Sequence, residues 1–387
     1  MKAGVKGIYR FWLRACLAGV ALLVMPALLA QGNDRAQAMA LEQSGQNAKS
    51  EQIWAGIAKA EPHNAEALAH LGLLEARQEH YDAAIGYYRQ ALAIKPDLPG
   101  LQMNLGLALF KAAQFPDAIK SFTAEIRKHP GDQRLTILLG MSHYGMGDYL
   151  VAIPYLRKAA SNDPQNLPLR MALAHSCLWS KQYQCVLDVY QEILALNAES
   201  AEADMLAGEA LDEKGDSAGA IDQFRAAAVA NPKEPNVHFG LGYLLWTHSQ
   251  YADAAKEFQS ELDNDPQHTQ ARVYLADSLV ELNEFGKALP ELEQVVKADP
   301  SEALAHRDLG IVYADAGRKE EAVKELQKAI ELDPKDVAPH WRIARLYQSM
   351  GRKDEAKVEF ERANKMLKET NQALQDKLAG VRPSAPH

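Results

Sequence analysis

Residues Ala303–Asp336 read ALAHRDLGIVYADAGRKEEAVKELQKAIELDPKD, and segments of the same pattern recur every 34 residues through most of the chain. In this segment Leu309, Val312 and the residues around them have the spacing of the apolar face of a helix. Gly317 interrupts that helix, and a second apolar run of helical spacing ends before Pro334. The pattern therefore predicts an antiparallel hairpin of two helices. Such a hairpin cannot bury its apolar surface alone, so we expect successive hairpins to stack.

Prolines mark the 34-residue period, because proline is favoured just past the end of a helix. Setting them at repeat position 32 places nine full repeats over residues 65–370. The prolines are Pro62, Pro96, Pro130, Pro164, Pro232, Pro266, Pro300 and Pro334, and Ala198 stands where one further proline is expected.

Residue size is nearly constant at three positions of the repeat. Position 8 is always Gly or Ala, as at Gly310, and position 20 is Ala in all repeats but one, as at Ala322. Position 24 is always bulky and apolar, as at Leu326. Small residues let the two helices of a hairpin approach closely, and we expect the bulky residue to fill the space between neighbouring hairpins.

This pattern resembles the tetratricopeptide repeat family, closely over residues 65–370 and loosely over residues 31–64. Its signature is matched by Leu309, Gly310, Tyr313, Ala322, Leu326, Ala329 and Pro334. The resemblance implies an all-α fold, a right-handed superhelical solenoid of stacked antiparallel helix hairpins. We expect residues 31–64 to form a degenerate N-terminal repeat or cap, residues 371–379 to extend the last helix, and residues 380–387 to form a loose tail.

Residues 1–30 have the profile of a signal peptide. Four basic residues and no acidic residue accompany the apolar run ACLAGVALLVMPALLA at residues 15–30. The run is shorter than the roughly 20 residues that span a bilayer, so we expect cleavage between residues 30 and 38. The mature chain is then exported, to the periplasm or the extracellular space. The alternative is an uncleaved segment that anchors the chain to the membrane.

The charge of the chain argues against a nucleic-acid partner. Removing residues 1–30 takes away four basic residues and changes the formal net charge from −9 to −13. No run of Lys and Arg is present that would neutralise successive phosphates.

Cys177 and Cys185 are the two cysteines outside the predicted signal peptide, and they lie eight residues apart across a predicted turn. In an oxidising compartment this spacing is compatible with a disulfide. The alternative is two buried thiols, since free cysteine is among the most buried residue types.

Sequence motifs of catalysis are missing from the chain. It has no Gly-rich phosphate loop, no CxxC pair, no HExxH and no nucleophile elbow, and its 12 histidines are scattered. We therefore expect no enzymatic activity, no cofactor and no metal site.

The first helix of each hairpin has one face that predicts binding. Positions 4, 7, 8 and 11 face the second helix, so positions 2, 5, 9, 12 and 13 face away from it and line the inner wall of the solenoid. We call this the inner face. Aromatic and methionine side chains on a concave wall are typical of a peptide-binding groove. The predicted groove residues are Met103, Leu107, Phe110, Met141, Tyr144, Met171, His175, Trp179, Phe239, Tyr243 and Trp246.

Acidic residues on the same face predict the charge of the partner. They form a predicted acidic patch of Glu202, Glu209, Asp212, Glu213, Asp277 and Glu281. A peptide with apolar or aromatic residues and some basic residues fits both features. The alternative is that neighbouring first helices cover the apolar side chains, which are then ordinary core residues.

The sequence thus predicts an exported, non-enzymatic repeat scaffold that binds a protein or an extended peptide, in assembly or maturation of the cell envelope. A second hypothesis is an accessory subunit of an envelope enzyme encoded elsewhere, because the family often supplies repeats to glycosyl transferases, proteases and secretion machinery.

Overall fold

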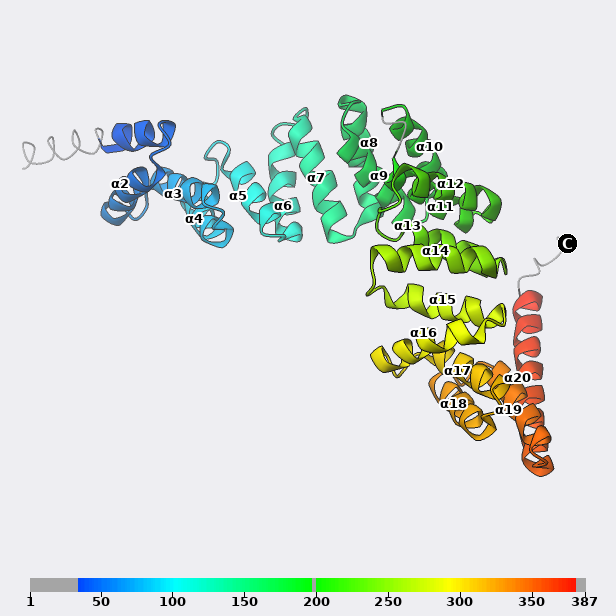
Figure 1. The fold of residues 1–387 in the computed structure, drawn as a ribbon. Helices are drawn as coiled ribbons and strands as arrows, with labels where there is room; N and C mark the ends of the chain where they lie inside the picture. The colour runs from blue at the N-terminus through cyan, green and yellow to red at the C-terminus, as the bar shows by residue number, and fades with distance from the viewer. Residues whose placement is uncertain (1–33, 197–199, 381–387) are drawn as a thin grey trace, which may run out of the picture. The chain divides into compact units, whose positions relative to one another are not determined.

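The computed structural model describes residues 34–196 and 200–380, and those residues form helices and connecting turns without a strand. The chain divides into two compact units, unit 1 up to Gln182 and unit 2 from Tyr183 onward. Within each unit the helices pack side by side in chain order (Figure 1). The predicted all-α array of helix hairpins is confirmed.

Unit 1 contains a helical segment over residues 34–43 and eight further helices. These are α2 (Asn47–Ala60), α3 (Ala65–Arg77), α4 (Tyr81–Ile94), α5 (Leu101–Lys111), α6 (Phe115–Ile126), α7 (Gln133–Met146), α8 (Tyr149–Asn162) and α9 (Leu167–Trp179).

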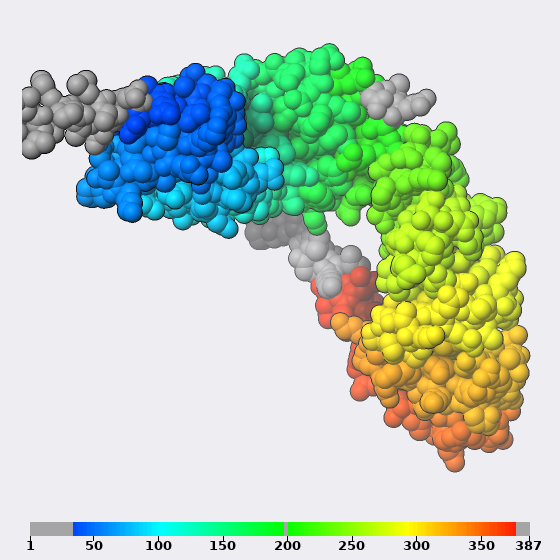
Figure 2. Space-filling model, turned by 60° about the vertical axis from the view of Figure 1, so that its left-hand side comes forward, coloured from blue at the N-terminus to red at the C-terminus, as the bar shows by residue number. Residues whose placement is uncertain are grey.

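Unit 2 contains the remaining helices. These are α10 (Tyr183–Leu194), α11 (Ala201–Glu213), α12 (Ser217–Ala230), α13 (Val237–Thr247), α14 (Tyr251–Asn264), α15 (Thr269–Glu281), α16 (Phe285–Ala298), α17 (Ala303–Asp315), α18 (Lys319–Leu332), α19 (Ala338–Ser349) and α20 (Lys353–Gly380). On the face of unit 2 drawn in Figure 2, side chains of successive hairpins meet over a continuous surface.

The bulky residue at position 24 packs within its own hairpin as well as against the next one. A Cβ atom added at Gly208 would lie 2.7 Å from the ring of Phe224 in the same hairpin. A Cβ atom added at Gly240, in the following hairpin, would lie 2.3 Å from the same ring. Small residues are therefore needed on both sides of the ring. At Phe224 the residue packs against the next hairpin, as expected, and it also packs within its own hairpin.

A side-chain bond between the two helices repeats in four consecutive hairpins of unit 2. His238 contacts the carboxylate of Glu257 at 2.6 Å, and His306 contacts Glu325 at the same distance. The corresponding pairs in the other two hairpins are Arg272 with Glu291 and His340 with Glu359. Histidine in these first helices is therefore a structural partner of a carboxylate.

Helices α5 and α13 begin late and share a distinct start. Each is 11 residues long, against 13 for α3 and α9, and each follows a proline and a left-handed residue. That residue is Gly100, with φ 73°, or Asn236, with φ 64°. The same two repeats carry a buried glutamate at position 27, Glu125 and Glu261, where the other repeats have Ile, Ala or Val.

The two glutamates have different partners. The carboxylate of Glu261 accepts hydrogen bonds from the backbone N–H groups of Asn236 (3.2 Å) and Phe239 (3.0 Å), so it caps α13. The carboxylate of Glu125 instead lies 3.9 Å from the Lys128 ammonium and 3.7 Å from the His129 ring. The start of α13 is therefore fixed by a buried side chain.

Candidate functional site

Four aromatic side chains gather at the inner face of unit 1, three from first helices and Tyr149 from the second helix α8. The Trp179 ring lies 4.6 Å from the Tyr149 ring, 4.9 Å from His175 and 5.8 Å from Tyr144, measured between centroids. We call these four residues the unit 1 aromatic cluster. Trp179 remains 49% exposed. The cluster therefore presents a large aromatic surface to solvent.

The other predicted groove residues of unit 1 are mostly half-buried. Leu107 is 37% exposed, and Phe110 packs edge-on against Phe115 at 5.7 Å. Met103, Met141 and Met171 are intermediate in exposure. Neighbouring helices therefore cover part of this face but leave these apolar side chains partly accessible.

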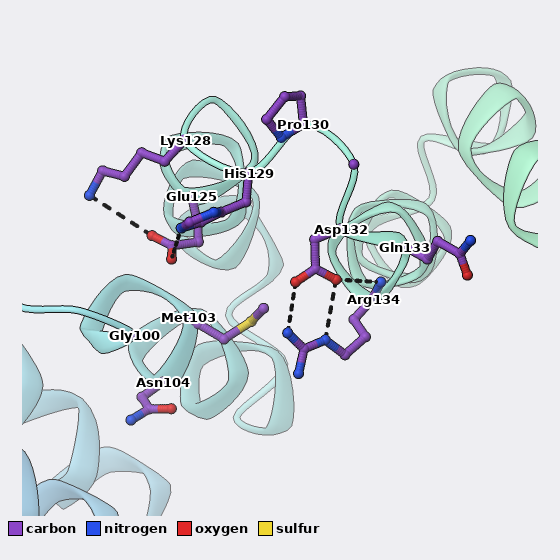
Figure 3. Close-up of a pocket in the computed structure, with 11 residues that line it drawn as sticks. Gly100, Met103, Asn104, Glu125, Lys128, His129, Pro130, Asp132, Gln133 and Arg134 are labelled. Atoms are coloured by element: carbon purple, nitrogen blue, oxygen red, sulfur yellow. Dashed lines mark hydrogen bonds and ion pairs between the residues drawn. The ribbon is translucent and has the colours of Figure 1, made fainter.

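Met103 also lines a pocket between the start of α5, the end of α6 and the start of α7 (Figure 3). The pocket has a volume of about 1020 Å³. Its charged groups are paired with each other, because Arg134 donates to Asp132 at 2.8 Å and Glu125 contacts Lys128 and His129. Pairing inside the pocket leaves little net charge to attract an ionic ligand.

A second aromatic cluster lies at the inner face of unit 2 and includes Tyr274, which is at repeat position 6 beside that face. Tyr243 lies 5.9 Å from Trp246 and 5.4 Å from Tyr274, and Trp246 lies 4.9 Å from Tyr274. Phe239 completes the set at 6.2 Å from Tyr274. We call these four residues the unit 2 aromatic cluster. Tyr243 is 39% exposed, whereas the others are partly buried.

The unit 2 aromatic cluster rests on a buried group of charges. The Trp246 indole N–H donates to Asp277 at 2.6 Å, and Arg307 donates to Asp277 at 2.5 Å and to Asp308 at 3.0 Å. Burial raises the pKa of Asp308 well above its ordinary value, and the charge of Asp277 adds to this effect, while Arg307 opposes it. Asp277 is 2% exposed, so it is a structural acceptor and presents no surface charge.

A small pocket opens between α11 and α13, and we call it the Gly240 pocket. Its volume is about 210 Å³. Its lining consists of Met205, Glu209, Asp212, Phe224, Asn236, Phe239, Gly240, Tyr243 and Leu244. The pocket brings two predicted groove residues, Phe239 and Tyr243, next to two residues of the predicted acidic patch.

The remaining acidic residues have varied surroundings. Glu202, Glu213 and Glu281 are exposed, and Glu213 accepts a hydrogen bond from the Tyr183 hydroxyl at 2.9 Å. Four exposed carboxylates therefore lie along α11, counting Glu209 and Asp212 of the pocket.

Sequence reasoning missed several residues that build these sites. Tyr149 is at position 17, which is aromatic in six of the nine repeats, and this column was a usable signal. Glu261 stands in a column of apolar residues, and Gly240 is the one glycine at position 6 among the nine repeats. Residues that differ from the rest of their repeat position, such as Glu261 and Gly240, therefore locate these sites as well as the chemistry of the inner face does.

Other predictions concern features beyond these sites. The signal peptide lies outside the described residues. Cys177 lies in α9 and is buried, and Cys185 lies in α10; the disulfide between them stays a prediction. In the described part of the chain, no three His, Cys, Asp or Glu side chains are grouped to hold a metal ion. None of the described helices is long and apolar enough to cross a membrane.

Curated proteins resemble parts of the chain. BBSome complex member BBS4 of Xenopus tropicalis is 26% identical over 144 residues, which are 37% of this chain and 28% of that protein. TPR repeat-containing protein MJ1428 of Methanocaldococcus jannaschii is 28% identical over 153 residues, which are 39% of this chain and 27% of that protein. The chain therefore spans less than a third of the length of these relatives.

Solved structures resemble it over comparable lengths. MamA 41-end from Desulfovibrio magneticus RS-1 is 25% identical, covers 44% of this chain and 96% of its own, and gives a TM-score of 0.39. YrrB, described as a TPR protein with an unusual peptide-binding site, is 19% identical, covers 49% of this chain and 97% of its own, and gives a TM-score of 0.40.

Two family models, both described as "Tetratricopeptide repeat", match the chain. The first matches residues 35–99, 103–166, 187–235, 213–269, 239–288 and 275–337, and the second matches residues 313–379. These matches extend over most of the chain and over the helix hairpins of both units. The chain belongs to the tetratricopeptide repeat family.

Proposed function

We propose that this chain is a non-enzymatic scaffold whose inner faces bind an extended peptide or a protein partner, in assembly or maturation of the cell envelope. One observation carries the proposal: Trp179 is 49% exposed although three aromatic rings surround it. Burial of such a ring on binding removes a large apolar area from water. Trp and Tyr are also the residues most enriched where binding energy concentrates.

The setting of these rings supports the same function. Ring contacts hold the side chains of both aromatic clusters in place before a partner arrives, which lowers the entropy lost on binding. Tyr243, 39% exposed, gives unit 2 an accessible ring of the same kind. Each unit therefore offers its own aromatic contact surface.

A photocrosslinking experiment in cells tests the proposal. A photoreactive amino acid replaces Trp179 in one variant, Tyr243 in a second and Val229 in a third, which is an exposed apolar control in α12. We expect a discrete crosslinked partner from the first two positions and none from the control. The partner is then purified, and Trp179→Ala should weaken its binding by tenfold or more. Identical crosslinks at all three positions, or none at any, would contradict the proposal.

Export is part of the proposal and has its own test. The charge and hydropathy of residues 1–30 support it. Residues 1–38 are fused to a reporter enzyme that is active only outside the cytoplasm. We expect reporter activity and a shortened product; activity with a product of full length indicates a membrane anchor, and no activity refutes export.

A further inference from the structure

Gly240 lies at repeat position 6 and allows the Phe224 ring to pack against the α13 backbone in the wall of the Gly240 pocket. The preceding and following repeats have Leu206 and Tyr274 at this position. At Gly240 the ring of Phe224 approaches so closely that even a Cβ atom would lie 2.3 Å from it. Phe224 is 4% exposed and Leu244 is also 4% exposed, so the pocket has a buried apolar wall.

The mouth of the pocket carries charged side chains, whereas its wall is apolar. Asp212 and Glu209, both exposed on α11, line it from one helix, and Tyr243 lines it from α13. Lys214 directly follows α11, and its ammonium donates a hydrogen bond to the Gln184 side-chain oxygen at 2.8 Å. The mouth therefore places the exposed Asp212 carboxylate next to an aromatic ring.

We infer that the Gly240 pocket binds the side chain of an arginine in the partner peptide, an inference that rests on the proposed function. The methylene groups of the arginine pack against Phe224 and Leu244. The guanidinium stacks on the Tyr243 ring and donates hydrogen bonds to the Asp212 carboxylate, in the field of Glu209.

Arginine fits this combination better than the two other candidate side chains. A guanidinium is planar and weakly hydrated, so it stacks on an aromatic ring and pairs with a carboxylate at once. A lysine ammonium is a compact, strongly hydrated charge that gains less from the ring. A purely apolar side chain offers no hydrogen bond to the Asp212 carboxylate and partly desolvates it.

The first experiment selects peptides from a random phage-displayed library on the full chain. We expect enriched sequences to contain arginine next to apolar or aromatic residues. Enriched sequences without arginine would overturn this inference and leave the proposed function standing. If no sequence is enriched, both the inference and the proposed function fail.

The second experiment uses a selected peptide and its copy with citrulline, the neutral isostere, in place of arginine. On the wild-type chain we expect citrulline to weaken binding about tenfold, the effect of losing one charge-assisted pair. On Asp212→Asn the same replacement should weaken binding less than about twofold. Asp212 is exposed, so this variant is expected to fold normally.

A matched control completes the design. Asp315 is also an exposed aspartate in the last turn of a first helix, but it lies on α17 and outside the pocket. The citrulline effect on Asp315→Asn should equal that on the wild-type chain. An equal citrulline effect on Asp212→Asn and on the wild type would show that the arginine binds elsewhere.

Discussion

Trp179 in unit 1 and Trp246 in unit 2 both belong to inner-face aromatic clusters, yet the structure holds them differently. Trp179 contacts aromatic rings and is half exposed. The indole of Trp246 donates to Asp277, a buried carboxylate that also binds Arg307. The first ring is available to a partner, and the second is part of a polar support.

The difference shows what the repeat leaves undetermined. The repeat position of a residue determines which way its side chain points. Whether that side chain is buried or hydrogen-bonded depends on the residues of the neighbouring repeats. In unit 2 two buried carboxylates, Asp277 and Glu261, bind groups of the preceding elements. We therefore expect the stability of the inner face of unit 2 to depend more on buried hydrogen bonds than that of the inner face of unit 1.

The largest expected effect comes from removing the shared acceptor. Asp277→Ala removes the buried acceptor of the Trp246 indole N–H and of one Arg307 N–H, so that Arg307 keeps only Asp308. Breaking a buried pair on one side typically costs about 3 to 5 kcal/mol. Urea denaturation of the purified chain measures the loss. The control is Glu281→Ala on the same helix, where the carboxylate is exposed and the change should stay within about 0.5 kcal/mol. Equal losses of stability for the two variants would show that Asp277 contributes no more to the fold than an exposed carboxylate does.

The two glutamates at position 27 give the next effect. Glu261→Ala removes the acceptor of two backbone N–H groups at the start of α13 and should cost about 2 kcal/mol. Glu125→Ala removes only longer contacts to exposed Lys128 and His129, so the cost should be below about 1 kcal/mol. Hydrogen exchange of the α13 amides provides a local measurement. Faster exchange in Glu125→Ala than in Glu261→Ala would contradict the capping role.

The buried charges of unit 2 also predict a dependence on pH. Burial raises the pKa of Asp308 above its ordinary value of 3.8, so the unfolded chain loses this proton at a lower pH than the folded chain does. Stability from this group is therefore present below pH 3.8 and is lost as the pH rises through the folded-state pKa. Asp308→Asn cannot titrate, so its stability relative to the wild type should increase from pH 4 to pH 7. A constant or decreasing difference in denaturation midpoints over that range would refute the assignment.

Much of the fold was predictable because the 34-residue period constrains it at every level. Gly310, Ala322 and Leu326 report helix packing directly, since only small residues permit the observed approach of the two helices. The helices also end where the prolines predicted. Local spacing and packing thus agree in each repeat, which is why sequence alone was sufficient for the architecture.

The sites were less predictable because they depend on contacts between repeats. Helical spacing placed Tyr243 and Asp277 on one face, but only the structure separates an exposed ring from a carboxylate that is 2% exposed. Tyr149 lies on a second helix, whereas the predicted inner face contains only residues of first helices. Gly240 has no side chain that would suggest binding, although the sequence does show it as the one glycine at position 6 of the nine repeats.

A matched pair of substitutions gives the smallest effect and compares the two tryptophans directly. Trp246→Phe keeps an aromatic ring but loses the indole N–H that donates to Asp277, which should cost about 1 kcal/mol. Trp179→Phe keeps the ring contacts of a half-exposed side chain and should change stability by less than about 0.5 kcal/mol. Thermal and urea denaturation measure both. If Trp179→Phe proves the more destabilising, the exposed ring supports the fold rather than a partner, and the contrast between the two faces is wrong.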